Sequence, residues 1–570
     1  MLKGIAASDG IGIGKAVIFA DADISFESHP VTDVTAEIQK YKAAIDKFSD
    51  RTEKQAETLR QNTGDKEADI LLGHILMIKD PYLDNEIETL IRNGVCVESA
   101  LVKVCENFID MFSATEDDLI KQRVTDIKDI RDAVLRILLG AEEINLANLP
   151  QDSVLVADEL TPSVTAGIDK KKVVGIVTRQ GGLTSHSAIL ARALGIPAVL
   201  GVHDILEKCV TGKEIIVNGQ TGDVILDVTP EQLCEYKNKQ QEYIRLNEYN
   251  QLYLNKQTVM KDGKSVQLFC NIGNATDIQQ VIENSGEGIG LFRTEFLFMN
   301  TQRQPSEEEQ FEVYKKVAVA MNGKVVTIRT LDVGGDKDIP YLKLDKEANP
   351  FLGLRAIRYC LNNIPLYKTQ LRAILRASNY GNIRIMIPLV TCIEEVRAVK
   401  ELIETVKLEL SHENIRFKSD IKIGVMIETA SAAVIADILA KECDFFSIGT
   451  NDLIQYTMSV DRGNDKIAYL YSPYQPSVLR LIKNIIEQGK NAGIEVGMCG
   501  ETAANPLLIP IFLSFGLDEF SVTPSSVLQT RRIISYWGKI DADDLSTHVL
   551  KIDSAEKVQK ICKKYERAAE

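Results

Sequence analysis

The second half of the chain repeats one pattern. After about residue 258, short strand-like runs alternate with helical stretches. Eight runs occur in order, and they read VQLFCNIG, GIGLFR, VVTIRTLD, IRIMIPLV, KIGVMIET, FFSIGTND, EVGMCGE and EFSVT. Short β-branched and aromatic runs that alternate with helices are typical of parallel β/α units. Eight such units in succession predict a TIM (β/α)8 barrel over residues 258–570.

Polar side chains gather at the predicted carboxyl ends of these strands, where barrel enzymes carry their chemistry. They are Arg293, Arg329, Asp332, Glu428, Asn451, Asp452, Cys499 and Glu501. Arginines, with Arg462 further along, can bind phosphate and carboxylate oxygens in a bidentate way. Two carboxylates from neighbouring strands suit an octahedral Mg²⁺, and a thiol opposite them can move a proton. Singly, each residue is more often a surface ion pair or a strand-end cap, so their joint appearance at one rim is the signal.

The N-terminal half is predicted to contain two domains, one interrupting the other. The first residues, GIAASDGIGIGKAVIFA, combine glycine turns with a strand, and from about Thr32 to about Leu139 the pattern is helical. Strand and turn signals return in SVLVADEL, KVVGIVTRQGG and EIIVNGQTGDVIL. The simplest architecture is a mixed α/β domain of residues 1–20 and 144–227, with a helical insertion at residues 21–143.

A polar helix is predicted to follow the α/β domain. Thr229 and Pro230 form a cap and first-turn signature ahead of EQLCEYKNKQQEYIRLNEYNQ. Such a helix suits a linker between moving domains, although an ordinary surface helix has the same composition. We assign residues 228–257 to this linker.

One histidine stands at a glycine-to-helix transition, in GGLTSHSAILARALGIPAVLG. Thr184 or Ser185 can cap the predicted helix, and Gly195 can end it. His186 then falls in the first turn, where unpaired N–H groups and the helix dipole attract anions and disfavour a protonated imidazole. A neutral imidazole beside an anion site is a nucleophile for phosphorus or carbon. For a lone histidine the default role is a capping hydrogen bond, and only the barrel rim weighs against it.

Composition narrows the class of protein. The net charge of -15 argues against a non-specific nucleic-acid binder and is compatible with a basic protein partner. The start of the chain, MLKGIAASDG, lacks the apolar core of a signal peptide, and apolar runs stay below membrane-spanning length. The 10 cysteines form no CxxC pair, which favours reduced thiols over a disulfide framework or a zinc site. We therefore expect a cytoplasmic protein with no direct membrane insertion.

At these motifs the sequence resembles enzyme I of the phosphoenolpyruvate-dependent sugar phosphotransferase system. The resemblance covers essentially the whole chain. It rests on GGLTSHSAILARALGIPAVLG, GIGLFRTEFLFMN, IRTLDVGGDK, NPFLGLRAIR, IGTNDLIQYTMSVDRGN and GMCGETAAN, in that order. It implies a swivelling α/β phosphohistidine domain, a helical insertion that docks the phosphocarrier protein HPr, and a dimerising C-terminal barrel that binds phosphoenolpyruvate.

The resemblance also implies a role for each site residue. His186 would carry the phosphoryl group, with Arg192 as a neighbour of the phosphate, and Cys499 would protonate the enolate. Glu428 and Asp452 would hold Mg²⁺. Phosphoenolpyruvate would be bound by Arg293, Arg329 and Arg462, aided by Asn451 and Asp452. The expected reaction passes the phosphoryl group to the enzyme's own histidine, then to the histidine of HPr, and releases pyruvate.

Other functions are weaker fits. Pyruvate phosphate dikinase and phosphoenolpyruvate synthase need a large ATP-binding domain before the histidine domain, whereas only about 140 mostly helical residues precede it here. The segment DGIGIGKA fails the phosphate-loop pattern, because Asp9 and Ala16 stand where that pattern needs Gly and Ser or Thr. We expect no room for the sensory domain of a nitrogen-regulatory enzyme I. A non-catalytic phosphocarrier-binding regulator is the alternative of a different class, and the intact set of His186, arginines, acids and Cys499 weighs against it.

Overall fold

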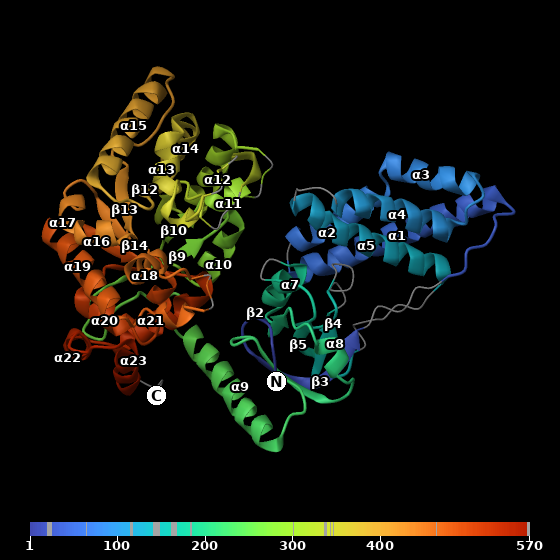
Figure 1. Cartoon of the computed structure of the whole chain (residues 1–570), viewed down its shortest axis with the longest axis horizontal. Coiled ribbons are helices and arrows are strands. Elements are labelled where there is room, and N and C mark those ends of the chain that lie inside the picture. Colours follow the sequence, from blue (N-terminus) through green and yellow to red (C-terminus); the bar gives the residue numbers. More distant parts are fainter. Residues whose placement is uncertain are drawn as a thin grey trace. The chain divides into compact units, whose positions relative to one another are not determined.

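The computed structural model divides into two compact units, Met1–Arg245 and Leu246–Glu570 (Figure 1). It describes the chain except for residues 20–25, 64, 114–117, 141–148, 161–167, 183–184, 300, 302, 336–338, 343, 346, 463, 465 and 567–570. The side chains of residues 58, 59, 61–63, 65–70, 118–122, 125, 186, 189, 193 and 340 also lie outside the description.

The first unit contains an eight-stranded sheet with the order β1-β8-β7-β3-β4-β5-β6-β2. Its strands are β1 (Leu2–Lys3), β2 (Ile5–Ser8), β3 (Ile11–Phe19), β4 (Ser153–Ala157), β5 (Val173–Thr178), β6 (Ala198–Leu200), β7 (Glu214–Asn218) and β8 (Asp223–Ile225). Strands β3 to β6 are parallel, and the others join them antiparallel. The sheet therefore combines chain segments from before and after the helical insertion. Among the described residues, helices α7 (His186–Leu194) and α8 (Ile205–Lys208) follow its strands.

The insertion is a bundle of helices with its own core. They are α1 (Val34–Thr63), α2 (Asp65–Ile78), α3 (Pro81–Arg92), α4 (Val97–Ser113) and α5 (Asp118–Leu139). Their apolar faces meet around Tyr41, Ile87 and Leu101, as the helical periodicity requires. Ala56 of α1 and Leu71 of α2 belong instead to the hydrophobic cluster that contains Ala188 of α7. The bundle thus packs against the helix that begins at His186.

The second unit is a closed parallel barrel with the order β10-β11-β12-β13-β14-β15-β16-β9. The strands are β9 (Gln267–Ile272), β10 (Ile289–Arg293), β11 (Val325–Arg329), β12 (Asn382–Ile387), β13 (Lys422–Ile427), β14 (Phe445–Ile448), β15 (Glu495–Met498) and β16 (Glu519–Val522). These are the eight predicted runs, which confirms the fold prediction. Their long buried stretches suit strands that side chains cover on the inside and helices cover on the outside.

Helices cover the outside of the barrel, and the last of them lead to the C-terminus of the chain (Figure 1). They are α10 (Ile278–Glu283), α11 (Glu295–Met299), α12 (Glu307–Ala320), α13 (Ala356–Asn362), α14 (Ile364–Ser378), α15 (Ile393–His412), α16 (Ala430–Val434), α17 (Ala436–Leu439), α18 (Thr450–Met458), α19 (Pro476–Ala492), α20 (Ile509–Phe515), α21 (Val527–Tyr536), α22 (Lys539–Val549) and α23 (Ala555–Lys564). A single hydrophobic core joins these helices to the strands.

A polar helix, α9 (Pro230–Gln251), connects the two units. It begins where the cap signature predicts, and the N–H of Gln232 donates to Thr229 Oγ1 at 3.2 Å.

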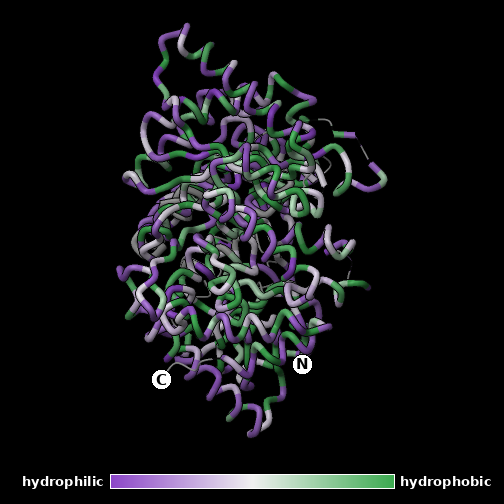
Figure 2. The backbone as a smooth tube through the Cα atoms, turned by 90° about the vertical axis from the view of Figure 1, so that its left-hand side faces the viewer, coloured by the Kyte–Doolittle hydropathy of each residue, from purple (hydrophilic) through white to green (hydrophobic). Residues whose placement is uncertain are grey.

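Hydrophobic and hydrophilic stretches alternate along the backbone (Figure 2). Among the helices in the described part of the chain, none is both long enough and apolar enough to cross a membrane.

Candidate active site

A cavity of about 700 Å³ opens at the carboxyl ends of the barrel strands. Every residue that the sequence placed at this rim lines it: Arg293, Arg329, Asp332, Glu428, Asn451, Asp452, Arg462, Cys499 and Glu501. These side chains come from strands and loops that are far apart in the sequence. The closure of the parallel barrel brings them together, because all strand ends then meet at one face.

A chain of alternating charges forms one wall of the cavity. Arg329 Nη2 lies 2.8 Å from Glu295 Oε1 and 3.1 Å from Asp332 Oδ2. Arg355 Nη2 lies 2.9 Å from Asp332 Oδ1 and 3.2 Å from Asp452 Oδ2. Burial opposes the charge on both guanidinium groups, but the carboxylates outweigh it and raise the pKa of each arginine. The network thus holds two permanent positive charges in the cavity wall, and Arg355 lies directly beside Asp452.

Each of these two arginines also has a donor without a partner in the described part of the chain. The Nε–H groups of Arg329 and Arg355 are buried and donate to no partner among the described residues. Buried donors left unsatisfied are uncommon in proteins and cost free energy, so they call for an explanation. At a cavity wall, such donors are suited to the oxygens of an anionic ligand.

Two carboxylates meet at the ends of neighbouring strands. Glu428 follows β13 and is 2% exposed, and Asp452 lies in the first turn of α18, after β14. Burial, followed by the charge of Asp452, raises the pKa of Glu428 to about 8. Glu428 Oε1 accepts the N–H of Leu389 at 2.6 Å, and Leu389 adopts a φ of 54° that is unusual for leucine. This hard-oxygen pair fits a divalent cation such as Mg²⁺, which would relieve the repulsion between its members.

The Cys499 thiol is buried at the end of β15. It is 6% exposed and belongs to an apolar cluster inside the barrel with Leu291, Met386, Met426 and Phe445. Burial raises the pKa of Cys499 to about 12. The thiol therefore keeps its proton at neutral pH, and an apolar floor under the cavity separates it from bulk water.

More exposed polar groups surround the mouth of the cavity. The Arg293 guanidinium lies 4.8 Å from the centre of the Phe296 ring. Arg462 Nη1 lies 3.7 Å from Asp452 Oδ1. Asn451 Oδ1 accepts the backbone N–H of Glu501 at 3.2 Å, which joins the start of α18 to the segment that follows β15. A ligand bound by the buried arginines, Arg329 and Arg355, would contact these groups at its outer end.

His186 is the first residue of α7, in the other unit. Ser185 is the N-cap and accepts the N–H of Ala188 at 3.4 Å, and Gly195 ends the helix with a φ of 67°. Thr184 and the His186 side chain lie outside the described residues. Arg192 Nε donates to the carbonyl of Ala188 at 3.1 Å. The predicted position of His186 in a first helical turn is confirmed.

Comparisons with known proteins match all three regions of the chain. Models of phosphoenolpyruvate-utilising enzymes match residues 3–123 with the N-terminal domain, 149–222 with the mobile domain and 248–537 with the phosphoenolpyruvate-binding domain. The phosphoenolpyruvate-protein phosphotransferase of Staphylococcus carnosus is 43% identical over 100% of this chain and 99% of its own. Those of Priestia megaterium and Bacillus subtilis are each 44% identical, over 98% of this chain and 97% and 98% of their own.

This chain belongs to the phosphoenolpyruvate-protein phosphotransferase family. The barrel cavity of this family member lies within the residues that match the phosphoenolpyruvate-binding domain. Helix α7 lies within the residues that match the mobile domain.

The structure adds two residues to the site that sequence reasoning left without a role. Arg355 lies in the motif NPFLGLRAIR and Glu295 in GIGLFRTEFLFMN, both typical of this phosphotransferase family. Neither residue ends a barrel strand, so the strand-end rule did not select it. One signal in the sequence could have identified them. Each is a charged residue inside a long motif, and nothing else explains its presence there.

Proposed function

We propose that this chain transfers the phosphoryl group of phosphoenolpyruvate to His186 and then to the histidine of the phosphocarrier protein HPr. The reaction releases pyruvate and begins the sugar phosphotransferase system. The observation that carries the proposal is the barrel cavity, which combines anion-binding arginines, a buried carboxylate pair and a protonated thiol. The names of the full-length relatives support the same activity.

The substrate is a small dianion or trianion with a phosphate at one end and a carboxylate at the other. Arg293, Arg329 and Arg462 bind these groups, with the Asn451 amide at the mouth as a further partner. Arg329 brings a buried Nε donor that lacks a protein partner among the described residues. Its charge is fixed by the adjacent carboxylates, so it need not reorganise as negative charge develops on the substrate.

Mg²⁺ is the proposed cofactor, and Glu428 and Asp452 would hold it. Bound there, it would supply positive charge that stabilises the phosphate and enolate oxygens. Within the chain itself, Arg355 orients Asp452 from one side and the Leu389 N–H orients Glu428 from the other. These partners fix both carboxylates before any ligand arrives.

The reaction proceeds by in-line displacement at phosphorus. The unprotonated imidazole nitrogen of His186 attacks, the N–P bond forms, and the P–O bond to the enolate oxygen breaks. The enolate carbon then takes the proton of the Cys499 thiol and becomes the methyl group of pyruvate. The Cys499 thiolate regains a proton from solvent after pyruvate leaves. Protonation at carbon makes the transfer favourable, because pyruvate is far more stable than its enol.

The division of labour follows the domains. Residues 1–20 and 144–227 form the swivelling phosphohistidine domain, residues 21–143 dock HPr, and residues 228–257 link this part to the barrel. The barrel, residues 258–570, binds phosphoenolpyruvate and dimerises, and the protein works in the cytoplasm. Contact between the insertion and α7 supports this arrangement, since HPr bound there would lie in the same unit as His186.

Direct phosphorylation tests the proposal. Incubation of the whole chain with phosphoenolpyruvate and Mg²⁺ should add one phosphoryl group that is lost in acid but stable in base, as expected for phosphohistidine. Intact mass spectrometry before and after acid treatment measures it. A wild-type chain that stays unmodified with Mg²⁺ present would overturn the enzyme assignment and favour a non-catalytic regulator.

Removal of the proton donor should slow turnover without preventing binding. Cys499→Ala should lower the rate of pyruvate formation by about 10²–10⁴-fold, the usual worth of a positioned proton donor. Calorimetric binding of phosphoenolpyruvate should change little. Cys443→Ala is the matched control, because Cys443 is also a buried barrel thiol but does not line the cavity. Equal rates in the two variants would exclude Cys499 as the donor.

The pH dependence follows from the same thiol. A proton donor is active in its protonated form, so activity is lost as pH rises through its pKa. Cys499, with a pKa of about 12, should still be protonated at pH 9, where an ordinary thiol with a pKa of about 8.5 is mostly ionised. Single-turnover pyruvate formation should therefore show no loss with a midpoint near 8.5. A loss at that midpoint that tracks thiol ionisation would contradict the assignment.

A further inference from the structure

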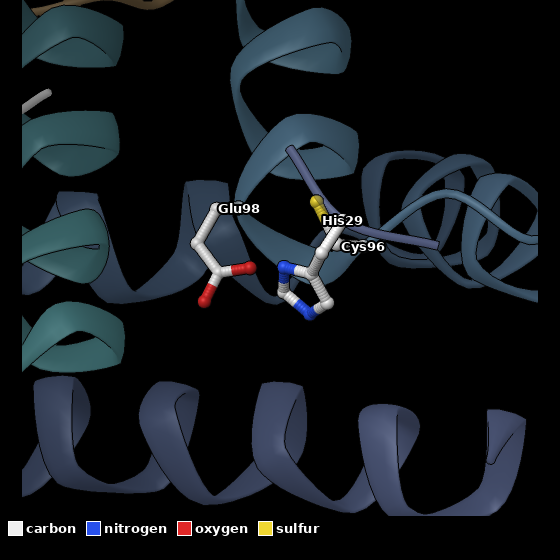
Figure 3. A group of neighbouring side chains, drawn as sticks. All are labelled: His29, Cys96 and Glu98. Carbon is white, nitrogen blue, oxygen red and sulfur yellow. The ribbon is translucent and has the colours of Figure 1, made fainter. Parts of the chain in front are cut away.

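Three potential metal ligands converge in the helical insertion, in the unit that does not contain the barrel cavity. The ligand atoms of His29, Cys96 and Glu98 all lie within 4.8 Å of one another. The imidazole of His29 and the carboxylate of Glu98 face each other, with the Cys96 sulfur close by (Figure 3). The reaction derived above uses none of these residues.

Local backbone structure holds the three residues together. Pro30 and Val95 form an isolated antiparallel bridge. The bridge brings their neighbours His29 and Cys96 together. In the chain, 66 positions separate Pro30 from Cys96. Cys96 immediately precedes α4, and Glu98 lies in the first turn of that helix. The N–H of Val97 donates to Glu37 Oε1 at 2.9 Å, which anchors the same helix end to α1. The cluster therefore joins the segment before α1 to the start of α4.

Glu98 has an oxygen that requires a partner. The residue is 3% exposed, and its Oε1 accepts from Lys40 Nζ. Its Oε2 is buried and has no hydrogen-bond partner among the described residues. A buried carboxylate oxygen without a partner is costly, so an unexplained one indicates a missing ligand. Because the oxygen is negative, that ligand is a cation or a hydrogen-bond donor.

Cys96 is placed to act as a thiolate. The Cys96 sulfur lies within hydrogen-bond distance of the hydroxyls of Ser99 and Ser28. The Ser99 hydroxyl lies 3.1 Å from the sulfur. The start of an α-helix also stabilises a negative sulfur through the unpaired N–H groups of the first turn. A thiolate at this position would be a strong ligand for a soft or borderline metal ion.

We propose that His29, Cys96 and Glu98 form a binding site for Zn²⁺ or a similar divalent transition metal. Thiolate, imidazole and carboxylate are ligands that zinc accepts, and the thiolate disfavours Mg²⁺ and Ca²⁺. Zinc bonds of about 2.0–2.3 Å place tetrahedral ligand atoms about 3.5 Å apart, so small side-chain rotations close the site. His29 is exposed, which lets its ring adjust and leaves the fourth position to water. Bound metal would connect the segment before α1, which contains His29, to the start of α4.

Metal titration of the full chain tests the site. Chelator-treated protein, with saturating Mg²⁺ present, should bind one Zn²⁺ per chain by elemental analysis after gel filtration. Co²⁺ in place of Zn²⁺ should produce a thiolate charge-transfer absorption band. Both signals should disappear in Cys96→Ser, and His29→Ala should weaken binding by more than the roughly 10–100-fold that loss of an outer-shell partner costs. Zinc should also raise the melting temperature of the wild-type chain but not of Cys96→Ser.

Two controls separate this site from other thiols. Cys234→Ser removes an exposed cysteine on α9, and Cys499→Ala removes the thiol of the barrel cavity. Both variants should bind one Zn²⁺ as the wild type does. His29→Ala changes an exposed side chain, so it tests the site even where Cys96→Ser fails to fold. A wild-type chain without zinc, or unchanged zinc binding in His29→Ala and Cys96→Ser, would overturn the proposal.

Discussion

His186→Ala should abolish phosphorylation of the chain by phosphoenolpyruvate. The imidazole is the proposed nucleophile, and removal of a nucleophile typically costs at least about 10⁴-fold in rate. We expect the acid-labile phosphoryl group to fall below detection and transfer to HPr to stop. Binding of phosphoenolpyruvate to the barrel cavity should persist, because His186 lies in the other unit. Intact mass spectrometry measures the first effect and calorimetry the second.

His203→Ala is the matched control for this experiment. His203 is an exposed histidine of the same α/β domain, outside α7 and outside every motif of the site. The His203→Ala variant should be phosphorylated by phosphoenolpyruvate at the wild-type rate. Acid-labile phosphate that survives in His186→Ala would refute the assignment of the phosphorylated residue, and its loss in both variants would point to a folding defect.

Arg355→Ala should have the largest effect on stability among the variants of the barrel. The guanidinium lies between Asp332 and Asp452, which are 2% and 8% exposed. Removal of one partner from a buried ionic network leaves uncompensated charge and costs about 3–5 kcal/mol. The urea transition of the barrel should move to lower denaturant by a corresponding amount. Activity measured below that transition should fall by about 10–100-fold, because Asp452 loses the partner that orients it.

A surface arginine provides the comparison. Arg397 pairs with Glu442 on the outside of the barrel, and its side chain is 58% exposed. Exposed pairs contribute about 0–1 kcal/mol, so Arg397→Ala should leave both the urea transition and the activity close to wild type. If Arg355→Ala were as stable and as active as Arg397→Ala, the buried charge network would not organise the site.

Much of the architecture could be predicted from local patterns. The barrel could be predicted from the eight strand-like runs rich in β-branched residues, because a parallel strand covered on both faces must be apolar along its length. Thr229 and Pro230 marked the start of α9, and Ser185 and Gly195 bounded α7, because caps and left-handed C-termini depend on a few adjacent residues. Apart from Arg462, the rim residues followed from one rule, that each stands where a predicted strand ends.

Other features required side chains from distant segments to meet. Arg355 lies between β11 and β12 without ending either strand, and its role appears only through its contacts with Asp332 and Asp452. The same holds for His29, which the motifs left without a role. It meets Cys96 and Glu98 through a backbone bridge that no local pattern predicts. The absence of a CxxC pair argued against a zinc site, but a site assembled from separate segments needs no such spacing.

The sequence by itself determined which elements form, in what order, and which polar residues stand at strand ends and helix starts. These properties depend on hydrophobic period, capping and turn chemistry, which act over a few residues. The tertiary structure alone decided which charges neutralise one another, which thiol loses contact with water, and which carboxylate oxygen remains unpaired. Those outcomes depend on burial and on distances between segments, because electrostatic energies in a low-dielectric interior change steeply with both.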